Sequence, residues 1–127
     1  MNPSQLLQAA DHLLERPDLD LRGAWPRAVA LLGRQALEGG LDQFWTQEFP
    51  NMMYASRRTQ TLCLAQFVRD PDLTDGIRES WASLTRACHH HPFELSPTAV
   101  ELKNWLVEVE RLVTQLSATT AADPMSN

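Results

Sequence analysis

The chain has 127 residues, of which 43% are hydrophobic and 21% charged, and its formal net charge is -5. These values favour one folded domain with its own core, and they argue against a disordered chain and against broad electrostatic binding of nucleic acid. No apolar run approaches the roughly 18–20 residues that span a membrane, and the N-terminus lacks the basic start and apolar centre of a secretory signal. We therefore expect a cytoplasmic protein with no membrane contact.

The first half of the chain predicts two helices. A first helix follows Asn2-Pro3-Ser4 and runs to about Glu15, because leucine and alanine recur there at helical spacing. Trp25-Pro26 starts the second helix, since proline fits the first turn, and Phe49-Pro50 ends it. Gly39-Gly40 interrupts its apolar stripe, which indicates either a kink or a close contact with another helix.

The second half predicts three more helices. A third spans about Ala55 to Val68, Thr74 caps a fourth, and Ser96-Pro97 opens a fifth as cap and first-turn proline. The residues expected to pack are Leu62, Ala65 and Phe67 in the third helix, Ile77, Trp81, Leu84 and Cys88 in the fourth, and Leu102, Trp105, Leu106, Val109, Leu112, Val113 and Leu116 in the fifth.

No segment shows the alternating pattern of a strand, so the predicted fold is all-α. We expect an antiparallel up-and-down bundle of four long helices plus a shorter N-terminal helix. Residues 1–116 form a single domain in this prediction, and the small, polar stretch 117–127 is a disordered tail. Cys63 and Cys88 lie far apart in helix-forming sequence, which predicts two reduced thiols.

Chemistry-bearing side chains gather in one segment, Arg86 to Pro97 (RACHHHPFELSP), at the expected junction of the fourth and fifth helices. At about 100° per residue, Arg86 lies about 180° from the apolar stripe of its helix and therefore points outward, whereas Cys88 belongs to the stripe. His91 directly precedes a proline and is expected to leave the helical conformation.

Three interpretations of this segment stay open. Arg86 and the histidines can simply neutralise the carbonyl groups at a helix end. A metal site would use imidazole and the Cys88 thiolate, but His89 and His90 project about 100° apart and do not easily converge on one ion. In the third interpretation, the Arg86 guanidinium holds a phosphodiester while a neutral histidine takes the proton from a ribose 2′-OH, a cleavage of RNA that needs no metal or cofactor.

The run Arg86-Ala87-Cys88-His89-His90-His91 matches the Arg-x4–6-His motif of HEPN domains, small helical bundles of which many are metal-independent endoribonucleases. The wider pattern over about residues 5–116 resembles an uncharacterised bacterial branch of this family. The similar stretches are LLQAADHLL, GRQALEGGLDQFW, TQTLCLAQFV and WASLTRACHHHPFELSPTAVELKNWL.

The resemblance implies that Arg86 binds phosphate and that His91 acts as general base or acid. It also implies a toxin or defence effector that forms a two-fold homodimer, with two motifs lining one cleft, and pairs with an antitoxin such as a nucleotidyltransferase-type protein. HEPN ribonucleases usually carry a polar residue directly after the arginine, where this chain has Ala87. The alternative that the resemblance implies is a noncatalytic module that binds nucleotide, RNA or protein.

Further binding candidates accompany the motif. His89, His90 and Glu94 lie beside it, and Glu94 can either orient a histidine or face solvent. Arg57 and Arg58 form either a phosphate-contacting pair or a solvated basic turn. The four tryptophans fall on apolar stripes or at helix starts, so we expect core packing rather than base stacking.

Overall fold

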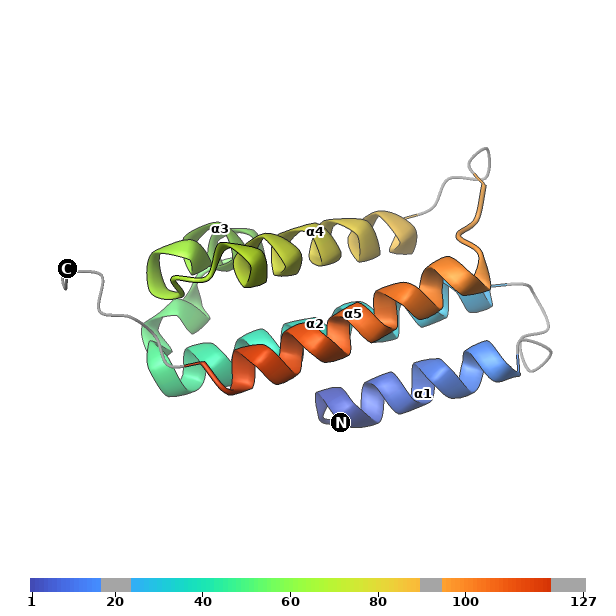
Figure 1. Cartoon of the computed structure of the whole chain (residues 1–127), viewed down its shortest axis with the longest axis horizontal. Coiled ribbons are helices and arrows are strands. Elements are labelled where there is room, and N and C mark those ends of the chain that lie inside the picture. Colours follow the sequence, from blue (N-terminus) through green and yellow to red (C-terminus); the bar gives the residue numbers. More distant parts are fainter. Residues whose placement is uncertain (17–23, 90–94, 120–127) are drawn as a thin grey trace.

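The computed structural model describes residues 1–16, 24–89 and 95–119, and in these ranges it contains helices, turns and loops but no strand (Figure 1). The prediction of an all-α protein whose helices pack as a bundle is confirmed. No described helix is both long enough and apolar enough to cross a membrane. The elements are α1 (Pro3–Glu15), α2 (Trp25–Glu48), the 3-10 helix η2 (Pro50–Tyr54), α3 (Arg57–Phe67), α4 (Pro71–Cys88) and α5 (Ala99–Ser117).

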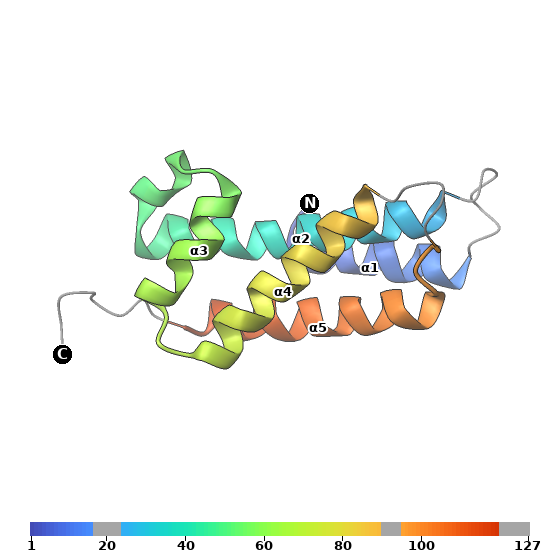
Figure 2. The same cartoon turned by 90° about the horizontal axis from the view of Figure 1, so that it is seen from above.

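α1, α2, α4 and α5 extend along the molecule, and each runs opposite to the one before it in this series (Figure 1). α2 and α5 lie side by side in the middle and run in the same direction, with α4 on one side of the pair and α1 on the other. Seen from above, α4 crosses the pair obliquely, and α3 lies at the end of the molecule near the start of α4 (Figure 2). α4 and α5 are joined at the opposite end.

The expectation that the N-terminal helix is the short one is wrong. α1 has 13 residues and packs on both α2 and α5, whereas α3 has only 11. The reason is local, because Pro50–Tyr54 form a 3-10 helix, and α3 starts only after Ser56, whose side chain accepts a hydrogen bond from the Thr59 N–H at 3.1 Å. α5 extends to Ser117, and the remainder of the predicted tail from 120 onward lies outside the described residues.

The caps of α4 and α5 differ from the predicted ones. Asp70, rather than Thr74, caps α4 by accepting from the Leu73 N–H at 3.2 Å. α5 begins after Thr98, rather than after Ser96, because Thr98 and Glu101 form a reciprocal capping box. In both cases a residue that completes the hydrogen bonds of the first turn defines the start of the helix.

α3 buries a mixed face of Gln60, Thr61 and Leu64, which differs from the predicted one. Leu62 is 57% exposed and Ala65 is also exposed, so their predicted packing is wrong, while Phe67 packs against the core as expected. The buried Gln60 amide donates to the carbonyl oxygens of Met52 at 2.9 Å and Ala55 at 3.2 Å. Gln60 therefore fixes α3 to η2 by hydrogen bonds that an apolar residue at position 60 could not make.

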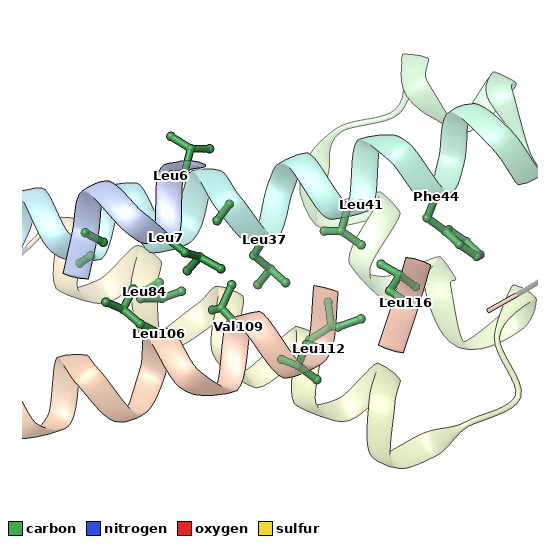
Figure 3. Packing of buried hydrophobic residues seen from close by; sticks show 14 of the residues in the cluster. Leu6, Leu7, Leu37, Leu41, Phe44, Leu84, Leu106, Val109, Leu112 and Leu116 are labelled. Atoms are coloured by element: carbon green, nitrogen blue, oxygen red, sulfur yellow. The ribbon is translucent and has the colours of Figure 1, made fainter. Parts of the chain in front are cut away.

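The core is built on α2 and α5 (Figure 3). The predicted stripe of α5 is buried at Leu102, Leu106, Val109, Leu112 and Leu116. At the α3 end, the Trp45 ring is fully buried and packs edge-on against Phe67, with ring centroids 5.3 Å apart. Leu37, Leu41, Leu84, Leu106, Val109 and Leu112 fill the space between α2, α4 and α5 (Figure 3).

Two glycines of α2 bring α5 unusually close. A Cβ at Gly33 would lie 3.0 Å from Leu106 Cδ2, and a Cβ at Gly40 would lie 3.0 Å from Val113 Cγ2. Gly33 and Gly40 are seven residues apart, as are Leu106 and Val113, so the two contacts repeat every second turn along parallel helices. α2 runs unbroken through Gly39 and Gly40, which supports a helix contact rather than a kink.

We predict that Gly40→Ala lowers the free energy of unfolding by about 1 kcal/mol, although alanine is the better helix former. The new methyl group meets Val113, a β-branched side chain that cannot turn away, and overpacking costs about 1–3 kcal/mol. Gly33→Ala is the comparison and should cost less, because its methyl group meets only the ends of two flexible side chains, Leu106 Cδ2 at 3.0 Å and Leu84 Cδ2 at 3.4 Å. Urea unfolding measures both, and a Gly40→Ala protein as stable as the wild type contradicts the prediction.

We also predict that Thr98→Ala destabilises the protein by about 1 kcal/mol while Ser96→Ala changes stability by less than about half of that. Thr98 satisfies the Glu101 N–H at 3.1 Å, whereas Ser96 makes no capping bond to α5. Thermal unfolding followed by circular dichroism compares the two variants. Equal losses of stability in the two variants would contradict the assignment of Thr98, rather than Ser96, as the cap of α5.

Candidate functional site

A pocket of about 310 Å³ opens between the last turns of α4 and the first turns of α5. It lies at the helix junction where the sequence concentrates its reactive side chains. Three groups of residues line it: Ser83, Arg86 and Ala87 from α4, Leu95, Ser96 and Pro97 from the connection, and Glu101 and Trp105 from α5.

Arg86 is exposed in the last turn of α4, as its position opposite the apolar stripe predicted. Its side chain makes no hydrogen bond or ion pair to any other residue in the described part of the chain, while its backbone carbonyl accepts from the His89 N–H at 3.1 Å. The guanidinium at this pocket can therefore offer its planar pair of N–H groups to a phosphate or carboxylate.

Ala87 packs into the core and is only 8% exposed, although it follows Arg86 directly. The buried face of α4 is thus broader than the predicted stripe, because it also includes Leu73, Ser80 and Ala87. Ser83, one turn before Arg86 and Ala87, lines the same pocket and places a polar residue beside them. Ser83 was not predicted from the sequence. It lies three residues before Arg86 and four before Ala87, and this helical spacing could have indicated that it shares their face.

Glu101 and Trp105 reach the pocket from one face of α5, because they are four residues apart. The Oε1 atom of Glu101 accepts from the Thr98 N–H at 3.3 Å and from the Thr98 hydroxyl at 3.1 Å. Its Oε2 atom has no hydrogen bond to any described residue. Trp105 packs partly against the core, as predicted, but it is not fully buried and also lines the pocket.

The histidines of the motif are only partly placed. His89 is exposed as the residue that ends α4, and it does not line the pocket. His90, His91 and Glu94 lie outside the described residues. The convergence of Arg86 and His91 on one substrate therefore stays a prediction.

The structure does not bring Arg57 and Arg58 to this pocket, because α3 lies at the other end of the molecule (Figure 2). Arg57 binds Glu38 through Nε at 3.1 Å and Asp42 through a terminal nitrogen at 2.8 Å, so it fixes the start of α3 to α2. Arg34 extends this network, since its Nε lies 3.2 Å from Glu38 Oε1. The Arg58 side chain is exposed and makes no hydrogen bond or ion pair within the described residues.

Cys88 occupies the opposite flank of α4, facing α2. Burial raises the pKa of its thiol, and the positive charges of Arg34 and Arg27 oppose that rise. Both cysteines are free thiols, as predicted. Nowhere in residues 1–16, 24–89 and 95–119 do three histidine, cysteine, aspartate or glutamate side chains gather in a way that could hold a metal ion.

No protein-family model, no curated protein and no solved structure matches the chain.

We predict that Arg57→Ala lowers the free energy of unfolding by about 1–2 kcal/mol and leaves any activity of the Arg86 pocket unchanged. The half-buried guanidinium joins two carboxylates of α2 and also donates to Gln60 Oε1, so its removal leaves several partners unpaired. Arg58→Ala is the matched control and should be neutral, because its exposed side chain has no such partners. Denaturant unfolding distinguishes the two, and a reversed order of stability would contradict this assignment.

Proposed function

We propose that this protein is a metal-independent endoribonuclease of HEPN type whose reaction is carried by Arg86 and His91. The observation that supports the proposal most directly is the Arg86 guanidinium, which is exposed, unpaired within the described residues and located at a pocket between α4 and α5. This is the position at which HEPN domains, which the sequence resembles, carry their motif arginine. An all-α bundle also agrees with that family.

In the proposed reaction, Arg86 donates two N–H groups to the nonbridging oxygens of a phosphodiester. His91 removes the proton from the neighbouring ribose 2′-OH, and the resulting oxygen attacks phosphorus. The P–O5′ bond breaks, and the leaving oxygen takes up a proton from an acid. The products are a 2′,3′-cyclic phosphate and a 5′-hydroxyl, and Arg86 stabilises the charge that builds on the phosphoryl oxygens.

The proposal includes a homodimer, because the acid and the base of this reaction are best supplied by two copies of the motif. A second HEPN-like chain placed with its Arg86 pocket against the first would line one shared cleft. The cytoplasmic setting, the toxin or defence role and the nucleotidyltransferase-type antitoxin partner belong to the same proposal and rest on the resemblance alone.

One observation favours a second candidate, a noncatalytic module that binds RNA, nucleotide or protein in the same cleft. Ala87 lines the pocket but has no polar side-chain atom, so the position that is polar in most HEPN ribonucleases contributes no side-chain hydrogen bond here. Ser83 lines the pocket one turn before Ala87, and its hydroxyl is available to replace the missing polar side chain. The two candidates share the binding step and differ in whether the phosphodiester is cleaved.

We predict that the protein cleaves RNA in excess chelator and leaves cyclic-phosphate ends, and that Arg86→Ala and His91→Ala each lower the rate at least about 100-fold. Both variants remove a group that acts on the reacting phosphodiester. Gel analysis of end-labelled RNA measures the rate, and the chemistry of the ends is checked by acid opening of the cyclic phosphate. DNA of the same sequence should stay intact, because it lacks the 2′-OH.

Arg78→Ala is the control, because Arg78 is an exposed arginine of the same helix that pairs with Asp75 at 2.9 Å outside the pocket. It should cleave RNA at the wild-type rate. Equal cleavage by the wild type and the Arg86→Ala variant would mean a contaminating nuclease and would reject the proposal. Arg86-dependent retention of RNA without cleavage would reject the enzyme and select the noncatalytic module.

A further inference from the structure

We propose that the pocket beside Arg86 is a base-recognition site that selects guanine, with Trp105 stacking on the base and Glu101 accepting from its N1–H and N2–H groups. This inference rests on the proposed RNA substrate and adds its specificity. It concerns a single unpaired nucleotide, since a base inside a duplex exposes neither its face nor that edge.

Trp105 has the properties of a stacking platform. Its indole is fixed on one side by the core cluster, and the rest of the side chain lines the pocket. An aromatic ring that is already immobilised loses little conformational freedom when a base stacks on it, and stacking accepts every base because each has a π face. Trp105 therefore supplies affinity, and the selectivity must come from a polar neighbour.

Glu101 is that neighbour, because it lies one turn before Trp105 on the same face of α5. Two donors of Thr98 occupy its Oε1 atom, which fixes the carboxylate and leaves Oε2 as an acceptor without a donor in the described residues. Guanine alone among the four bases presents two adjacent N–H donors on its Watson–Crick edge. Uracil places carbonyl oxygens beside its single N–H, and those oxygens are repelled by a carboxylate.

The pocket also has the size and the charge for one nucleotide. Its volume of about 310 Å³ is at the lower end of the range of about 300–1,000 Å³ for small-molecule sites, which suits a single base and its phosphate better than a longer strand. Arg86 provides the cation for the phosphate, and Glu101 provides the anion for the base edge. The Glu101 carboxylate, which also serves the capping box of α5, would repel a ligand that carries phosphate alone.

Glu101→Gln tests the acceptor while keeping the helix start. Glutamine serves as well as glutamate in a capping box, so the amide oxygen stays with the two Thr98 donors and the NH₂ group takes the place of Oε2. The outward atom then changes from an acceptor to a donor. The variant should bind guanine more weakly than the wild type does, and it should bind more tightly those bases, such as adenine, that present an acceptor at that edge.

The experiment measures binding of short 2′-O-methyl RNA strands that differ in one central base, by fluorescence anisotropy. These strands cannot be cleaved, so binding is read independently of the nuclease reaction. We expect the wild type to bind the guanine strand about tenfold more tightly than the adenine strand, and Glu101→Gln to abolish this preference. Trp105→Leu should weaken all strands about tenfold, and Trp105→Phe, which keeps an aromatic ring, should recover most of the loss.

Glu110→Gln is the matched control, because it makes the same charge change at an exposed position of α5 outside this pocket, and it should keep the guanine preference. A wild type without base preference, or without measurable binding, overturns the guanine site. So does a Glu101→Gln variant that tightens every strand equally, since that outcome reports only the lost negative charge. Guanine-selective binding without cleavage supports the guanine site and rejects the nuclease. Cleavage without base selectivity supports the nuclease and rejects the guanine site.

Discussion

The close approach of α2 and α5 across Gly33 and Gly40 is the contact on which the rest of the fold depends. A Cβ at Gly33 would lie 3.0 Å from Leu106 of α5 and 3.4 Å from Leu84 of α4, so three helices meet at this point. Leu84 lies next to Ser83 and less than one turn before Arg86, and the separation of α4 from α5 therefore depends on a backbone position in α2. The segment of α4 that lines the pocket therefore also takes part in this core contact, through Leu84.

α4 separates two different environments on its two flanks. One flank carries Ser83 and Arg86 toward the pocket against α5, and the other carries Cys88 toward α2. The thiol on the second flank is partly buried, and its raised pKa keeps it protonated and unreactive near neutral pH. Cys88 is therefore a poor source of the thiolate that a metal site at this segment would need, and Arg86 is the charged side chain that α4 brings to the pocket.

Helical periodicity was sufficient to predict the helices and most of the core, because each stripe depends only on neighbours along the chain. Periodicity failed to choose between Ser96 and Thr98, two similar residues that can each cap a helix. Thr98 is the cap of α5 because Glu101, three residues later, completes the capping box. Periodicity also failed for Arg57, whose role depends on two acids of another helix. Glu101 and Trp105 could not be joined to Arg86 from sequence, since no pattern within one helix reports which face a second helix will oppose.

The burial of Ala87 bears on the proposed HEPN-type function, because most HEPN ribonucleases carry a polar residue at the position after the motif arginine. Ala87 packs against the core at the edge of the pocket and is only 8% exposed, so a polar side chain there would lose most of its contact with water. An alanine avoids that cost, and it leaves Ser83, Arg86 and Glu101 as the polar residues of α4 and α5 in the pocket. These residues combine a cation with a fixed acceptor, and this combination supports the proposed nucleotide ligand, which offers both a phosphate and a donor edge, over a phosphate alone.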